Sequence, residues 1–310
     1  MGTVPSRQNV GVPTIAALAV AVLAISSSAP MIAYAAAPAL AIACWRNALA
    51  VGVLAPVAAA TRRAELARLA GRAGRPAAVA CLLAGCALAV HFGTWIPSAK
   101  LTGVAACTAL VATQPVWQGL IALGQGRRLP VAVWVGIALA VSGAVLTTGA
   151  DIGFSGRAFQ GDLLAIAGGV AAAVYTAFGE RARASTSTTT YTLICYGVCA
   201  VLLGAVCLVA GVPLVGYPAG AWFAILGLTA GPQLLGHSMF NYALRRISAP
   251  TVSVLVLLEV PGAALIGWLW LGQTPRVGQL PGLALLVAGV AVVVLGAARR
   301  VPAMTAVEEV

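Results

Sequence analysis

Charged residues are scarce in this chain of 310 residues. Only 8% are Asp, Glu, Lys or Arg, whereas about 25% is usual in soluble domains. Acidic residues number 7 and histidines 2. So few charges cannot cover a soluble surface, and hydrophobic residues, at 61%, take their place. With a mean hydropathy of +1.00, the composition indicates an integral membrane protein.

Motifs for nucleotide binding, metal binding and hydrolysis are missing from the sequence. Without a GxxxxGK[ST] loop, ATP coupling within this chain is not expected. HExxH, CxxC, paired-carboxylate and Ser/His/Asp patterns are also missing, and the cysteines lie in apolar segments where they suit packing. We therefore expect no catalytic residues, no metal and no cofactor, and we do not expect an enzyme.

Ten apolar runs have about the 20 residues that a bilayer-spanning helix needs. They are placed at residues 11–32, 36–59, 77–97, 102–123, 130–149, 161–180, 189–211, 219–242, 249–271 and 279–297. The gaps between them are too short for a soluble domain. The sequence therefore predicts an all-α membrane protein with ten transmembrane helices. The first run resembles a signal peptide, but removing it would break the pattern of the remaining loops.

Basic residues are concentrated in alternate loops. On one side of the predicted bundle lie Arg7, Arg62, Arg63, Arg68, Arg72, Arg75, Arg127, Arg128, Arg181, Arg183, Arg245, Arg246, Arg299 and Arg300; on the other lie Lys100, Arg157 and Arg276. Positive loops stay in the cytoplasm, which predicts a multi-pass protein of the cell membrane with both termini cytoplasmic. We therefore interpret the net charge of +11 as attraction of these arginines to anionic lipids of the bilayer, and we expect no nucleic acid as partner.

Two stretches of the chain repeat each other at an offset of 146 residues. The offset superimposes His91 on His237 and Pro115 on Pro261, and it aligns GIALAVSGAV from Gly136 with GLALLVAGVA further on. Each copy holds five predicted helices, an odd number, so the second copy must enter the membrane from the opposite side. We expect inverted five-helix repeats at 1–150 and 151–300, followed by a cytoplasmic tail at 301–310. Inverted repeats are typical of secondary transporters.

Several strings resemble the EamA family of the drug/metabolite transporter superfamily over almost the whole chain. They are HFGTWIPSAKLTGVAACTALVATQPVW from His91, LGQ at 123–125, ACWRNALA around Arg46, and HSMFNYALRRISAPTVSVLVLLEVPGAALIGWLWLGQ ending at Gln273. The resemblance implies a ten-helix carrier that moves small metabolites by alternating access, often outward. This chain has Gln125 and Gln273 where relatives usually carry Glu, which removes a charge at the rim of each half.

Two full charges lie deep within predicted helices, Arg46 and Glu259. A charge at the bilayer centre costs about 2.5 to 3.5 kcal/mol, so both should face the protein interior and find partners. We expect them to line one polar cavity in the substrate pathway. A structural ion pair, or a carboxylic acid kept neutral by burial, is the alternative.

Pro115 and Pro261 are expected to break or kink their helices, because proline has no N–H and clashes with the preceding turn. Unsatisfied backbone within a membrane is tolerated only against protein or a water-filled cavity. The prolines therefore predict cavity walls in both halves, with Thr113 and Gln114 beside the first. A purely mechanical kink is the alternative.

Histidine and aromatic residues complete the predicted substrate pathway. The remaining members are His91, Trp95, Trp117, Tyr175, Tyr196, His237 and Asn241. Asn241 is the repeat partner of Trp95. The two histidines serve either substrate and proton handling or hydrogen bonds between helices, and the sequence leaves both roles open.

The sequence as a whole predicts a secondary transporter that exports small metabolites or drugs, with protons as a candidate coupling ion through Glu259. A membrane-embedded enzyme would instead require His91, His237 and Glu259 to converge around a substrate. A non-transporting membrane subunit would show a filled interior without a cavity.

Overall fold

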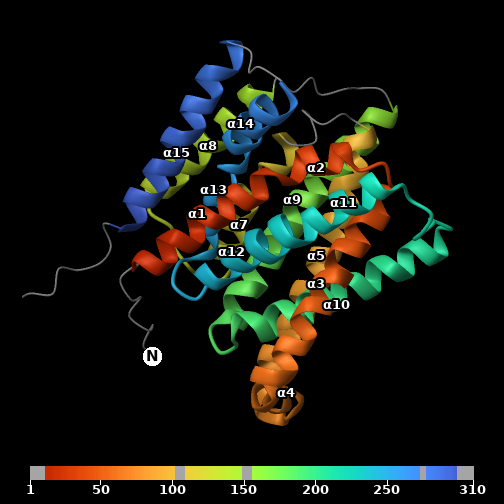
Figure 1. Ribbon diagram of the computed structural model, residues 1–310. Coiled ribbons are helices and arrows are strands. Elements are labelled where there is room, and N and C mark those ends of the chain that lie inside the picture. Colours follow the sequence, from red (N-terminus) through yellow and green to blue (C-terminus); the bar gives the residue numbers. More distant parts are fainter. Residues whose placement is uncertain (1–10, 102–108, 149–155, 273–276, 299–310) are drawn as a thin grey trace, which may run out of the picture.

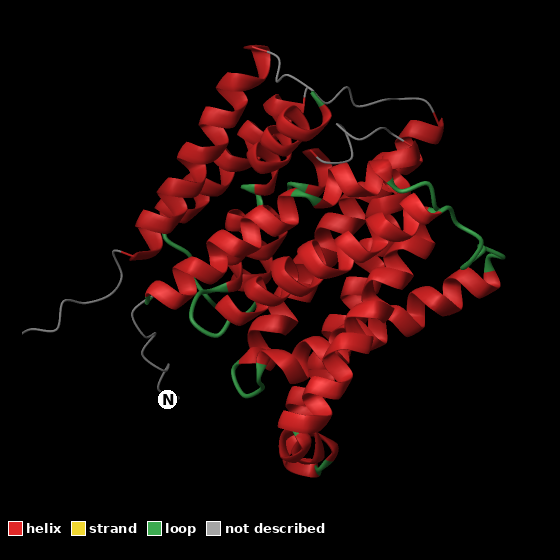
Figure 2. Cartoon of the chain, in the orientation of Figure 1, coloured by secondary structure: helices red, strands yellow, loops and turns green. Residues whose placement is uncertain are grey.

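The computed structural model describes residues 11–101, 109–148, 156–272 and 277–298, and these ranges contain helices and no strand (Figure 2). The predicted tail at 301–310, the boundary between residues 150 and 151, and Gln273 lie outside the described residues.

Most helices coincide with the predicted apolar runs. Their bounds are α1 Val12–Ser26, α2 Ser28–Tyr34, α3 Ala39–Thr61, α4 Arg63–Ala70, α5 Arg75–Leu101, α7 Gln114–Gly124, α8 Val131–Thr148, α9 Gly156–Arg183, α10 Thr188–Val209, α11 Ala219–Leu228, α12 Ser238–Ala243, α13 Ala249–Val256, α14 Glu259–Leu271 and α15 Leu280–Ala298. A π-helix, η2, occupies Thr229–His237, and short 3₁₀ turns occupy Arg72–Gly74 and Val277–Gln279.

Seven helical stretches in the described residues are long and apolar enough to cross a membrane. They are Val12–Ile32, Ala39–Thr61, Arg72–Ser98, Gly156–Arg183, Thr188–Val209, Ala249–Trp270 and Val277–Gly296, and Val131–Thr147 is a shorter apolar helix. The run expected at 102–123 lies partly outside the described residues, and the run at 219–242 is divided among α11, η2 and α12. The number ten therefore rests on the sequence pattern.

Several of these stretches are interrupted near the middle. The first breaks between α1 and α2, where the Ser26 hydroxyl donates to the Val22 carbonyl at 2.7 Å and the Ser27 hydroxyl to Ala24 at 2.8 Å. Serine hydroxyls that bond the preceding turn bend helices. The chain also turns between α13 and α14, and α7 begins directly after a turn. Discontinuous helices are thus a common element of this fold.

The two predicted helix-breaking prolines lie in the first turn of new helices. Pro115 is the second residue of α7, and Pro261 is the third of α14. Pro261 has no N–H and therefore cannot donate to the Leu257 carbonyl. That carbonyl instead accepts from the Val260 N–H at 3.1 Å, which forms a tight turn ahead of the proline. A third proline, Pro232, lies inside η2. π-Helical segments are rare in proteins and frequently occur at functional sites.

Two antiparallel helix pairs lie at opposite sides of the molecule, α8 with α15 and α3 with α10 (Figure 1). Most of the other helices lie between them, whereas α4 lies beyond the end of α3. Glycines bring α8 and α15 together. A Cβ added to Gly143 would lie 2.3 Å from the Leu286 nitrogen, and one added to Gly289 would lie 2.3 Å from the Ala140 nitrogen. Only glycine permits this backbone approach, which is how membrane helices pack without a hydrophobic driving force.

Candidate functional site

A cavity of about 60 Å³ lies among the interrupted helices. It is lined by Ile25, Ser28, His91, Phe92, Trp95, Val111, Gln114, Ala172, Tyr175, Thr176, His237, Phe240, Asn241, Leu244, Val252, Val256 and Glu259. Most of these residues come from α1, α2, α5, α7, α9, η2, α12, α13 and α14, and Val111 and Leu244 lie just outside α7 and α12, so both halves of the chain contribute. A water molecule needs about 10 to 15 Å³ measured this way, so the cavity has room for a few waters in this conformation.

Aromatic rings form one wall of this cavity. The His91 ring stacks on Trp95 with centroids 5.6 Å apart and an angle of 7°. Phe92 presents its edge or face to both histidines, at 5.1 Å from His91 and 5.6 Å from His237. Tyr175 approaches His237 at 6.2 Å. The structure therefore brings the two repeat-related histidines into one aromatic cluster.

The polar groups of the wall bond mainly across helices. His91 Nδ1 lies 2.9 Å from the Gly168 carbonyl, so this nitrogen carries the proton and joins α5 to α9. Asn241 Nδ2 donates to the Tyr175 hydroxyl at 2.7 Å, and Gln114 Nε2 donates to the Thr176 hydroxyl at 3.2 Å. Such bonds fix the orientation of each side chain and close the wall.

Glu259 differs from its neighbours in the wall. It is half-buried, and no hydrogen bond or ion pair joins its carboxylate to any residue that the structure describes. It also lines a second cavity of about 40 Å³, together with Ser28, Trp95 and Val111, which line the first as well. The carboxylate thus lies where two cavities adjoin, at the first residue of α14.

Arg46 does not line either cavity, contrary to the expectation that it shares one with Glu259. Its side chain is fully buried, and its Nε donates to Gln233 Oε1 at 2.8 Å. The guanidinium lies over the Phe92 ring, 4.6 Å from the centroid. Its two terminal nitrogens have no hydrogen-bond partner among the described residues. The arginine is held by a polar side chain and a ring, which replace the carboxylate that the sequence suggested.

Three other predicted pathway residues lie outside the cavity lining. The Tyr196 hydroxyl bonds the Gln233 carbonyl at 3.3 Å and the Ser238 hydroxyl at 3.2 Å, close to the Arg46 cluster. Trp117 Nε1, in the first turn of α7, donates to the hydroxyl of Thr113, the residue before that helix, at 3.1 Å.

Sequence reasoning missed several residues of the site. Phe92, Thr176 and Ser28 line the cavity, and Gln233 bridges Arg46 to Asn47, with its Nε2 donating to Asn47 Oδ1 at 2.9 Å. The phenylalanine has no polar group to mark it. Gln233, however, follows Pro232 within an apolar run, and a buried amide beside a helix-breaking residue is a signal that could have found it.

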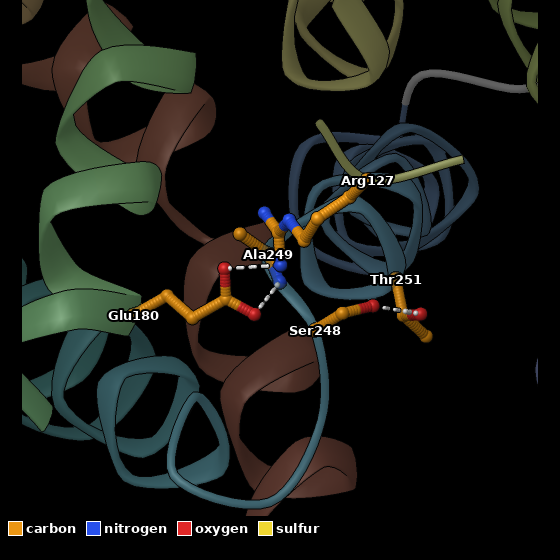
Figure 3. A network of polar contacts seen from close by, with 5 residues as sticks. All are labelled: Arg127, Glu180, Ser248, Ala249 and Thr251. Atoms are coloured by element: carbon orange, nitrogen blue, oxygen red, sulfur yellow. Dashed lines mark hydrogen bonds and ion pairs between the residues drawn. The ribbon is translucent and has the colours of Figure 1, made fainter. Parts of the chain in front are cut away.

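Two polar contacts join distant segments in the region of the predicted arginine-rich loops. Arg127 Nη1 pairs with Glu180 Oε2 at 2.9 Å, and the other oxygen of Glu180 accepts from the Ala249 N–H at 3.2 Å (Figure 3). Acceptance from the first residue of α13 satisfies a free helix N–H. One carboxylate thus ties α9 to α13 and to the segment after α7.

Glu65 on α4 makes the second contact. Its carboxylate accepts from the Ser187 N–H at 2.5 Å, the Ser187 hydroxyl at 2.6 Å and the Thr190 hydroxyl at 2.9 Å. Burial acts to raise the pKa of Glu65, but these hydrogen bonds outweigh it and leave the pKa below its ordinary value. Arg68 on the same helix donates to the Ser185 carbonyl at 2.7 Å.

Comparison with known proteins finds a family match in the second half of the chain. Residues 159–295 match the EamA-like transporter family. This region is an EamA-like transporter domain. An uncharacterized transporter from Archaeoglobus fulgidus is 26% identical over 199 residues, which are 64% of this chain and 69% of that protein. The EamA-like chain also shares the fold of a solved protein crystal structure, with a TM-score of 0.77, 23% identity, and coverage of 94% of this chain and 99% of the other.

These similarities confirm the family resemblance that the sequence strings predict. The EamA-like chain is a multi-pass membrane protein with several apolar helices, and its family consists of transporters that are generally not enzymes. A bilayer and a small-molecule substrate are the partners that membership implies.

Proposed function

We propose that this EamA-like protein is a secondary transporter that exports small organic molecules across the cell membrane by alternating access. The cavity among interrupted helices is the observation that carries the proposal, because residues from both halves enclose it and one wall bears a carboxylate that has no partner among the described residues. Transporter substrates bind where discontinuous helices meet near the middle of the membrane. The predicted pathway residues His91, Trp95, Gln114, Tyr175, His237, Asn241 and Glu259 all line this cavity.

Two inverted five-helix units, residues 1–150 and 151–300, form the framework of the proposed mechanism. The packing of α8 on α15 supports this arrangement. Gly136 approaches Gly289 and Gly143 approaches Gly282, and the offset of 146 residues exchanges these two contacts with each other. When a two-fold axis relates two units, each contact across their interface is repeated with the equivalent residues exchanged. The two glycine contacts have this relation.

Other helix contacts agree with the same axis. The packing of α5 on α9 has its counterpart in the packing of α1 on η2 and α12, as the offset requires. Likewise, α7 on α9 corresponds to α1 on α14. Ten crossings with both termini in the cytoplasm complete the proposed topology, as the alternating arginine loops indicate.

Alternating access requires contacts that break when the cavity opens on one side. Arg127 with Glu180, and Glu65 with Ser187, each join the first unit to the second. Both lie next to the predicted cytoplasmic loops, so we assign them to a cytoplasmic gate that is closed in this conformation. Ion pairs and hydrogen bonds at an accessible rim contribute little stability each and can separate readily.

Glu259 is the proposed coupling residue. A carboxyl in a partly dry cavity can exchange a proton with whichever side the cavity faces, and proton uptake can then drive substrate release. The two histidines line the same space and are the other titratable candidates, together with Tyr175.

The proposal is tested with purified protein in proteoliposomes loaded with a metabolite extract of the producing cells. Mass spectrometry compares what leaves these vesicles with what leaves protein-free vesicles, with and without a pH gradient. We expect at least one compound to leave only when the protein is present. Equal losses from both preparations, with the protein folded and oriented, would contradict the transport function.

A further inference from the structure

We propose that the transported molecule is an organic cation with a flat apolar body, whose positive group binds the carboxylate of Glu259. This inference rests on the proposed transport function and names the substrate class of the same cavity. It depends on three features of the cavity: the sign of its charge, the absence of a partner for that charge in the described residues, and the nature of the surrounding wall.

The charge of the cavity is set by Glu259. No Lys or Arg is among the described residues that line either cavity. The guanidinium of Arg46 lies against the Phe92 ring and outside the lining, so Phe92 separates it from the space that a ligand would enter. Among the described lining residues, a ligand carboxylate would therefore meet one acidic side chain and no Lys or Arg. This lining favours cations over anions.

The histidines do not supply the missing positive charge. His91 bonds a carbonyl through Nδ1 and stacks on Trp95, while His237 lies among the rings of Phe92 and Tyr175. No described carboxylate forms an ion pair with either ring. An imidazolium would be buried against aromatic neighbours without a counter-ion, which is costly, so both rings are expected to be neutral.

A half-buried carboxylate without a donor is itself costly, and a bound cation removes that cost. Glu259 has no hydrogen bond or ion pair with any described residue, whereas Glu65 and Glu180 each have several partners. These two glutamates outside the cavity thus find their partners within the protein. Glu259 is left for a ligand.

The aromatic wall suits the remainder of such a ligand. Trp95 and Phe92 line the same space as Glu259, and the faces of aromatic rings attract cations as well as flat apolar groups. Trp95 lines both cavities with Glu259, so a ring bound against it would reach the carboxylate with its charged end. The present volume of about 60 Å³ admits only the charged group and a few atoms, so the interrupted helices must separate to admit the whole molecule.

A matched set of probes tests the charge requirement in purified protein in lipid nanodiscs. Tryptamine, tryptophol and indole-3-propionate share an indole ring and differ in carrying a cation, a hydroxyl or an anion. Benzyltrimethylammonium adds a permanent cation with another ring. We expect calorimetry to show tryptamine binding about tenfold to a hundredfold more tightly than tryptophol, the range of a charge-assisted hydrogen bond, and no binding of the anion.

Variants then locate the effect. In Glu259→Gln, the affinities for tryptamine and tryptophol should differ by no more than about twofold. Glu259→Asp should retain part of the preference for tryptamine. Gly52→Ala, at a position in α3 where an added Cβ meets nothing within 4 Å, is the control and should leave the preference unchanged. Equal affinity for the three indole probes, or tighter binding of the anion, would overturn the inference, as would a preference for cations that survives in Glu259→Gln.

The vesicle experiment separates this inference from the transport function. Release of a cation that depends on Glu259 supports both. Protein-dependent release of a neutral or anionic compound alone would leave transport standing and refute the cation site. Selective, Glu259-dependent binding of tryptamine without any release would support the cation site and refute transport.

Discussion

The two deep charges of this protein, Arg46 and Glu259, are similar in the sequence and different in the structure. Arg46 is fully buried, bonds Gln233 and lies over the Phe92 ring, and it is not among the residues that line the two cavities described above. Glu259 lies where two cavities adjoin and has no partner among the described residues. Depth in the membrane therefore does not by itself assign a role to a charge. We propose that Glu259, which adjoins open space, serves the substrate, and that Arg46, which contacts Gln233 and Phe92, serves the packing.

The contrast extends to the backbone around each charge. Arg46 belongs to α3, a continuous helix of 23 residues that packs on α10. Glu259 begins a helix directly after a turn, beside the break at Ser27 in the first stretch. A continuous helix holds its side chains in fixed positions, whereas interrupted helices leave polar backbone beside a cavity and can move as separate pieces.

The largest effect is expected from Glu259→Gln, which removes the charge and keeps the shape. Accumulation driven by a pH gradient should fall by more than tenfold, because a neutral amide neither exchanges a proton nor attracts a cation. The folded protein and its size-exclusion profile should be unchanged, since Glu259 has no described partner to lose. Uptake into proteoliposomes with an imposed gradient measures the effect, and full activity in the variant would place coupling at another group.

Replacing Arg46 should affect stability and leave ligand charge preference intact. Arg46→Ala deprives Gln233 of its donor and leaves a void, which together should cost about 2 to 4 kcal/mol. Arg46→Met fills most of the volume and no longer buries a charge, so it should cost about 1 kcal/mol. Thermal unfolding in detergent compares the two.

The same variants test whether Arg46 belongs to the site. If Arg46→Met remained as stable as the parent yet lost binding of tryptamine, the arginine would act on the ligand. The structural assignment made from its contacts with Gln233 and Phe92 would then be wrong.

A smaller effect is expected at the contact between α8 and α15, which are continuous helices like α3. Gly143→Ala places a Cβ 2.3 Å from the Leu286 nitrogen, so the helices must move apart at a cost of about 1 to 3 kcal/mol. Gly52→Ala is the control, because a Cβ there meets nothing within 4 Å in the middle of α3. Equal thermal stability of the two variants would show that this contact is not tight in the membrane.

Much of the helical framework could be predicted from the sequence, because apolar length and glycine placement are local signals. The predicted runs at 36–59, 130–149, 189–211 and 279–297 correspond closely to α3, α8, α10 and α15. The family resemblance was likewise correct, and the second half of the chain carries it. The aligned strings GIALAVSGAV and GLALLVAGVA contain the glycines at which α8 and α15 meet, although the sequence does not say which helices these glycines join.

The partners of the buried charges could not be predicted in the same way. Whether Arg46 meets Glu259 or Gln233 depends on how α3 and η2 rotate about their axes, and apolar helices leave that rotation to packing. Aromatic residues such as Phe92 and Trp117 look alike in sequence, yet only Phe92 lines the cavity. Side-chain direction decides membership of the site, and a hydropathy pattern does not contain it.

The smallest expected effect concerns Glu65, which lies on α4, outside the predicted membrane-spanning helices. Unlike Glu259, its carboxylate accepts three hydrogen bonds, from Ser187 and Thr190. Its pKa is lowered in the folded state, so its stabilising contribution is present above the ordinary pKa of 4.5 and is lost as the pH falls through the lower folded value. Glu65→Gln should therefore reduce stability by less than about 1 kcal/mol at pH 7, as expected for a partly exposed contact. The variant and the parent should converge in thermal stability as the pH falls below the lowered folded pKa, where the parent carboxyl is protonated as well. If the difference in thermal stability between variant and parent stayed constant from pH 7 to pH 3, the charge of Glu65 would not contribute. Its contacts with the start of α10 would then depend on its shape alone.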